Sequence, residues 1–145
     1  AERGAMHLAL FNGLGIWLKG RANSWFSPGF QEVARQAYPM YQQQAPLLRS
    51  SDCHPLIDTL QEGLHANRFS EADLHLITFY NSSPRTISGA LLEGGGFLSG
   101  VGFAARDALT GQDWPLEGQT LHGTVPPNET RVVYLSKESS KADTP

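Results

Sequence analysis

Two stretches in the first half of the chain space their apolar residues as a helix does. After Ser27-Pro28, an N-cap followed by proline in the first turn, apolar residues recur every three or four positions as far as Tyr41, and Pro39 should kink or end the helix. A second helix is expected from about Pro55 to Leu64. Its inner face would consist of Leu56, Ile57, Leu60 and Leu64.

Residues 6–19 contain two apolar runs that flank Asn12-Gly13. Such a dipeptide favours a tight hairpin turn, because both central positions need positive φ. A single buried helix is the alternative interpretation. Gly13 and Gly15 would each cost that helix about 1 kcal/mol relative to alanine. The hairpin is therefore favoured.

The second half changes character, because short runs of β-branched and aromatic residues alternate with turn-forming residues. The pattern predicts strands at 74–80, 85–92, 116–124 and 131–136. It predicts turns at 81–84, 110–111 and 126–129, with a hairpin around the first. Between them, residues 94–103 are apolar and rich in glycine, which is typical of a flexible connector, a bulged strand or a mobile loop.

These elements predict one α+β domain over residues 1–137, with an antiparallel sheet or partial sandwich and two main helices. The polar segment 138–145 is expected to be a disordered tail. The length of 145 residues suits a single core.

Charge and hydropathy narrow the possible partners and the compartment. A net charge of −3, with basic residues scattered singly, argues against nucleic-acid binding. No apolar run is long enough for a membrane-spanning helix. The start at Ala1-Glu2-Arg3 is typical of a chain from which a signal peptide has been removed, and predicts a periplasmic protein.

The motifs of common catalytic and metal sites are missing from the sequence. There is no G-x-S-x-G motif, and Cys53 beside His54 is interpreted as a buried structural thiol. The five histidines lack ligand spacing, and the acidic residues do not form a calcium loop. We therefore expect neither an enzyme nor a bound metal or cofactor.

Exposed turns rich in Asn, Ser, Gly and Tyr have the composition of binding loops, which is also that of ordinary turns. We expect partner-binding residues in these turns and in the glycine-rich stretch. The predicted set is Asn12, Gly13, Gly15, Tyr80, Asn81, Ser82, Ser83, Gly94, Gly95, Gly96, Asn128 and Glu129.

The mature-looking start, the negative charge, the absent catalytic motifs and these loops together resemble the periplasmic immunity proteins that neutralise type VI secretion effectors. The resemblance implies a non-catalytic inhibitor whose loops occlude the active-site cleft of a secreted hydrolase effector, such as one that cuts peptidoglycan. One alternative is a periplasmic lipid or small-ligand binding protein with a groove lined by Trp17, Trp25 and Phe26. Another is an envelope hydrolase with a dispersed site that uses His54, His65 and His122.

Overall fold

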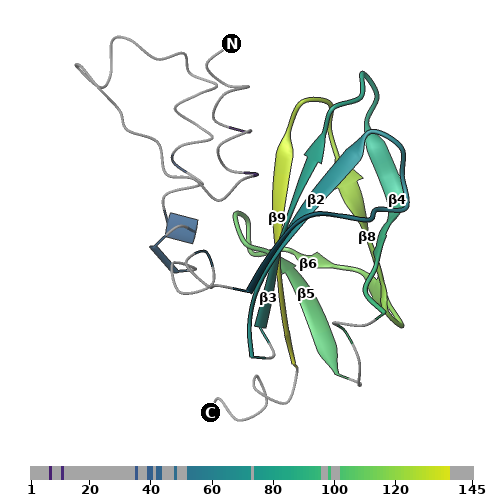
Figure 1. The fold of residues 1–145 in the computed structure, drawn as a ribbon. Helices are drawn as coiled ribbons and strands as arrows, with labels where there is room; N and C mark the ends of the chain where they lie inside the picture. Colours follow the sequence, from purple (N-terminus) through teal and green to yellow (C-terminus); the bar gives the residue numbers. More distant parts are fainter. Residues whose placement is uncertain are drawn as a thin grey trace, which may run out of the picture.

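The computed structural model describes residues 52–72, 74–95, 98 and 102–137, together with eight single residues nearer the start of the chain. Those eight all have helical backbone: His7, Phe11, Arg35, Pro39, Met40, Gln42, Gln43 and Leu48. In the continuous ranges the regular structure is entirely β (Figure 1). The expected α+β class with two main helices is therefore wrong.

The larger sheet, sheet A, has six antiparallel strands in the order β1-β2-β3-β9-β5-β6. Its long central strands are β2, β3 and β9, and both edges are formed by less buried strands. The strand bounds are β1 Asp52–Ile57, β2 Leu64–Glu71, β3 Leu74–Asn81, β9 Thr130–Lys137, β5 Phe103–Asp107 and β6 Asp113–Trp114.

The smaller sheet, sheet B, has three antiparallel strands in the order β4-β8-β7. Its bounds are β4 Ile87–Glu93, β8 Thr120–Val125 and β7 Leu116–Glu117. At one side, Pro115 joins β6 of sheet A to β7 of sheet B. At the other side, the segment between β1 and β2 binds β4, because Leu60 N donates to Leu91 O at 2.9 Å. The chain therefore ties the two sheets together along both sides.

The core lies between the sheets and draws on both of them. Side chains alternate between the two faces of a strand, so one residue in two points inward. Ile77 and Phe79 of β3, Val133 and Leu135 of β9, and Leu121 of β8 belong to this interior cluster. The face of sheet A that points toward the core is called its inner face below, and the opposite face its outer face.

Four predicted strands are present in the structure. Residues 74–80 form most of β3, residues 87–93 form β4, and residues 130–137 form β9. The segment 116–124 contains strands as expected, but a turn at Gly118-Gln119 divides it into β7 and β8. The predicted turns near Gly111 and Asn128 are also present, and both residues have positive φ. The antiparallel pairing is confirmed.

The predicted helix from Pro55 to Leu64 is wrong. Pro55 and Ile57 lie in β1, and Leu64 begins β2. Leu56 has a φ of 51° and is 67% exposed, and Leu60 is 51% exposed, so neither faces the core. The Leu56 amide is bound instead by the side-chain oxygen of Asn67 at 2.8 Å. This contact between strands replaces the local hydrogen bond that a helix would provide.

Two further expectations about the chain path need correction. The strands on either side of residues 81–84 do not form a hairpin, because β3 pairs with β2 and β9 whereas β4 pairs with β8 in the other sheet. In segment 6–19, His7 and Phe11 are helical rather than extended, and both are buried. The Asn12-Gly13 turn, most of the helix expected at 28–41, and the tail 138–145 lie outside the described residues.

Cys53 is exposed on β1, so its expected burial is wrong as well. The strand lies at an edge of sheet A, where few neighbours can cover its side chains. Among the described residues, no helix has the length and hydropathy needed to cross a membrane.

Candidate functional site

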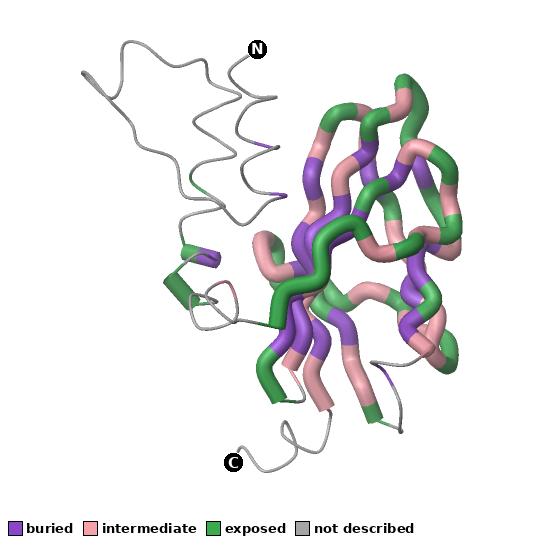
Figure 2. The backbone as a smooth tube through the Cα atoms, in the orientation of Figure 1, coloured by how far each residue is buried: buried purple, intermediate pink, exposed green. Residues whose placement is uncertain are grey.

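The outer face of sheet A is buried along its middle although it points away from the core. Phe69, Leu76 and Val132 are 5%, 0% and 0% exposed, yet they alternate with the inner-face residues and lie outside the interior cluster. Figure 2 shows runs of buried residues along the central strands, and β3 is buried without a break from His75 to Phe79. A strand that is buried on both faces has an almost continuous run of apolar residues in its sequence, as residues 74–79 do.

Three polar side chains in the middle of this face are also buried: Asn67 on β2, Thr78 on β3 and Thr130 on β9. Asn67 and Thr78 are directly opposed across the β2–β3 pair, and Thr130 lies opposite Tyr80. Burial of an unbonded amide or hydroxyl costs free energy, so each should have a partner. We call Asn67, Thr78 and Thr130 the anchoring face.

The anchoring face binds main-chain groups of the helical residues His7 and Phe11. The carbonyl of Phe11 accepts hydrogen bonds from Thr78 Oγ1 at 2.5 Å and from Asn67 Nδ2 at 3.1 Å. The carbonyl of His7 accepts one from Thr130 Oγ1 at 2.5 Å. Residues four apart lie on one side of a helix, so the two carbonyls approach the sheet from one helical face.

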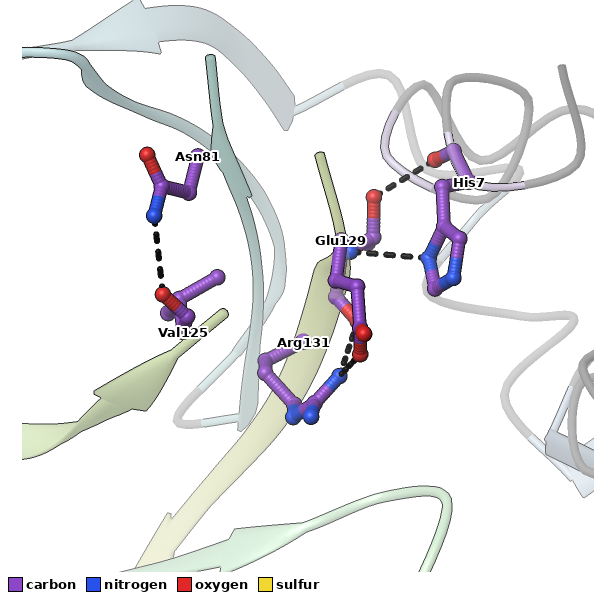
Figure 3. A network of polar contacts seen from close by, with 6 residues as sticks. His7, Asn81, Val125, Glu129 and Arg131 are labelled. Carbon is purple, nitrogen blue, oxygen red and sulfur yellow. Dashed lines mark hydrogen bonds and ion pairs between the residues drawn. The ribbon is translucent and has the colours of Figure 1, made fainter. Parts of the chain in front are cut away.

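Side chains of the same two residues complete the contact. His7 Nδ1 accepts a hydrogen bond from the main-chain amide of Thr130 at 2.8 Å, so this nitrogen carries a lone pair and no proton. The Phe11 ring lies 5.9 Å from the ring of Tyr80. Figure 3 shows His7 approaching β9 beside Glu129 and Arg131, which form an ion pair at 2.9 Å. The contact therefore combines polar and aromatic groups.

A second cluster forms where the chain crosses from sheet A to sheet B. The Asn81 side chain donates to Val125 O at 2.9 Å (Figure 3) and also to Arg85 O at 2.6 Å. Its Oδ1 accepts hydrogen bonds from the amide and the hydroxyl of Ser83. The main chain of Asn81 also bonds Asn128 and Glu129. Asn81 is fully buried, so its polar groups form hydrogen bonds inside the molecule.

The structure therefore brings together six of the predicted partner-binding residues, Tyr80 to Ser83 with Asn128 and Glu129. Ser82 and Asn128 are exposed there, whereas Asn81 is not. Gly94 and Gly95 lie at the opposite end of β4, where Gly94 N donates to Gln119 O at 2.7 Å. Asn12, Gly13, Gly15 and Gly96 lie outside the described residues.

The anchoring face was not predicted from the sequence. The one signal was Thr78, a polar residue inside the apolar run of β3. Asn67 and Thr130 gave no signal, because the partners that bury them are 56 and 123 positions away. Among the residues that the structure describes, no three His, Cys, Asp or Glu side chains are grouped as metal ligands would be.

Comparison with known proteins finds similarity at the level of the fold. No protein-family model matches the chain, and a search of curated proteins finds no match. Among solved structures, the chain is similar to an α-amylase from Geobacillus thermoleovorans complexed with acarbose, with a TM-score of 0.67 and 15% identity over 95% of this chain. It is also similar to α-galactosidase I from Mortierella vinacea, with a TM-score of 0.67 and 9% identity over 93% of this chain.

Both similarities establish the fold alone, since the identities are low. The chain covers 34% of the amylase and 35% of the galactosidase, so it spans about a third of the length of each. AmyP, solved in complex with maltose, gives the same proportion, with a TM-score of 0.63, 12% identity, and coverage of 92% of this chain and 34% of AmyP.

Proposed function

We propose that this chain is a non-catalytic β-sandwich module of a larger glycoside hydrolase, and that it holds a helical element of that enzyme against its larger sheet. The observation that carries the proposal is the anchoring face. Asn67, Thr78 and Thr130 are buried polar groups whose hydrogen bonds go to helical carbonyls.

The anchoring face favours a supporting role, because its polar groups are already used. A catalytic or ligand-binding site presents convergent polar groups toward an open space. Here the hydroxyls of Thr78 and Thr130 and the amide of Asn67 all donate to main-chain oxygens within the chain. Their role is therefore attachment, with hydrogen bonds supplying the register of the contact and apolar burial supplying most of its free energy.

The comparisons support the glycosidase part of the proposal. The structural neighbours include an α-amylase, an α-galactosidase and AmyP, each about three times as long as the part that this chain matches. In such a polypeptide, the other two thirds would supply the catalytic residues. The module would then stabilise the catalytic portion and hold it in position.

The immunity-type inhibitor of a secreted hydrolase stays a prediction, as do the periplasmic location and the absence of enzymatic activity. Its strongest remaining support is the exposed turn pair of Ser82 and Asn128. Its weakest point is Asn81, whose side chain is buried and fully engaged within the chain. The alternative ligand groove of Trp17, Trp25 and Phe26 lies outside the described residues.

An antibody raised against residues 52–137 tests the proposal on the native protein. The precipitated antigen is sized on a denaturing gel, and the precipitate is assayed with p-nitrophenyl α-glucoside and α-galactoside. We expect an antigen far larger than the 15.8 kDa of this chain, together with hydrolysis of at least one substrate.

Three outcomes would overturn the proposal. A 15.8 kDa antigen without hydrolysis would show that the chain is not part of a larger enzyme. A 15.8 kDa antigen that brings down a separate hydrolase polypeptide would favour the inhibitor instead. A large antigen that hydrolyses neither substrate would remove the glycosidase assignment.

A further inference from the structure

Side chains on the outer face of sheet A become more exposed from the central strand β3 toward β5. Leu76 on β3, Tyr134 on β9 and Arg106 on β5 are cross-strand neighbours on this face. Leu76 is fully buried, Tyr134 is half-buried and Arg106 is exposed. The outer face therefore continues past its covered part as a partly open surface.

The open part consists of Ala104, Arg106, Tyr134 and Ser136, which we call the β5–β9 patch. Ala104 and Ser136 are paired across β5 and β9, and both are small and half-buried. Small opposed side chains let another element approach the sheet closely. Tyr134 beside them offers a large ring with a polar hydroxyl, a combination enriched at protein interfaces.

Arg106 gives the patch a charge that is only loosely neutralised. Its Nε lies 4.0 Å from Asp113 Oδ1, and the two side chains are 50% and 83% exposed. An exposed ion pair at this distance contributes little and can exchange partners. The guanidinium is therefore available to a carboxylate on an approaching surface.

The outer face of sheet B differs from the β5–β9 patch, because it carries polar side chains that bond to one another. Its exposed side chains satisfy one another, as Ser88 does with Thr124 at 3.0 Å and Thr120 does with Glu93 at 2.7 Å. Small polar groups bonded in this way are typical of a face that meets water. The β5–β9 patch instead carries the ring of Tyr134 and the methyl group of Ala104.

We propose that the β5–β9 patch is a docking surface for the catalytic portion of the larger enzyme, and that it meets an apolar surface carrying a carboxylate for Arg106. The proposal rests on the proposed function. Its main argument is continuity, since the patch lies on the same outer face of sheet A as the anchoring face, and Tyr134 is two positions along β9 from Val132, which is paired with Thr78. Burial already raises the pKa of Tyr134, in agreement with a partly covered ring.

Hydroxyl-radical footprinting of the native protein and of the isolated 145-residue chain tests the patch. We expect Tyr134 to be modified several-fold more slowly in the native protein than in the isolated chain. Leu56 and His122 serve as controls, because they lie on β1 and on the outer side of sheet B, and their rates should agree in both samples. Equal rates for Tyr134 would overturn the proposal even if the native antigen is large and hydrolyses a glycoside.

A charge-reversal variant gives an independent test. Arg106→Glu in the native protein should lower its melting temperature while leaving that of the isolated chain unchanged, and Arg85→Glu on the exposed connector should change neither. An unchanged native melting temperature would count against the docking surface. If the isolated chain sediments as a dimer with Tyr134 protected, the patch binds a second copy and the proposal is overturned. A native antigen of 15.8 kDa would refute the proposed function and this inference together.

Discussion

The hydroxyl of Thr78, in the middle of β3, donates a hydrogen bond to the main-chain carbonyl of Phe11, 67 positions earlier in the chain. Thr78 is completely buried, although its neighbours Ile77 and Phe79 point to the other face of the sheet and fill the core. Sheet A therefore packs on both sides. On one side it meets sheet B, and on the other it holds a helical surface.

Replacing Asn81 should weaken the connection between the two sheets. Asn81→Ala removes a buried amide that donates to Val125 O and Arg85 O and accepts from Ser83, so the carbonyl of the buried Val125 loses its side-chain donor. We expect a loss of about 3 kcal/mol in the free energy of unfolding, measured by urea denaturation. Ser88→Ala, on the exposed side of sheet B, is the control and should change it by less than about 0.5 kcal/mol. An Asn81→Ala protein as stable as this control would show that the cluster is unimportant.

Gly123 should tolerate no side chain. A Cβ at this position would lie 2.3 Å from Cζ3 of Trp114, and that ring is stacked on Phe79 with centroids 6.1 Å apart. Gly123→Ala should therefore displace Trp114 and destabilise the fold by roughly 1–3 kcal/mol. Tryptophan fluorescence and urea denaturation measure the two effects. Gly95→Ala meets nothing within 4 Å and is the matched control. Equal stability of the two variants would contradict the packing described for Trp114.

Tyr134 should make the stability of the chain fall at high pH. Burial raises its pKa from 10.0, so the fold disfavours the phenolate. The stabilising contribution is complete below the unfolded pKa and is lost as pH rises through the folded pKa. Urea denaturation between about pH 8 and about pH 11 should therefore show a smaller decline for Tyr134→Phe than for the unmodified chain. Identical declines would mean that Tyr134 titrates in the folded chain as it does in the unfolded one.

The strands of the second half could be predicted because their residue types directly match the buried sheet in which they lie. β3 and β9 are rich in β-branched and aromatic residues, and turn-forming residues delimit them. β2 was missed because Asn67, Arg68 and Ser70 interrupt its apolar pattern. The buried amide of Asn67 donates to the carbonyl of Phe11, 56 positions away, and the buried hydroxyl of Ser70 bonds His75 on the neighbouring strand.

The helix expected at 55–64 shows the limit of periodicity. Leu56, Ile57, Leu60 and Leu64 have helical spacing, yet only Leu64 enters the core, with Ile57 packed against it. The decisive contacts are long-range, such as Leu60 with Leu91 and Leu56 with Asn67. For the same reason the anchoring face could not be predicted, since its partners come from the other end of the chain.

The most direct test of the account is hydrogen exchange of the peptide that contains His7 and Phe11. Thr78→Val combined with Thr130→Val keeps the shape of both side chains and removes both hydroxyl donors. The account predicts faster exchange in this peptide, with the amides of residues 120–125 in β8 as well protected as before. Thr124→Val, on the exposed face of sheet B, should leave both regions unchanged. Unaltered exchange around His7 and Phe11 in the double variant would contradict the claim that the outer face of sheet A anchors a helical surface.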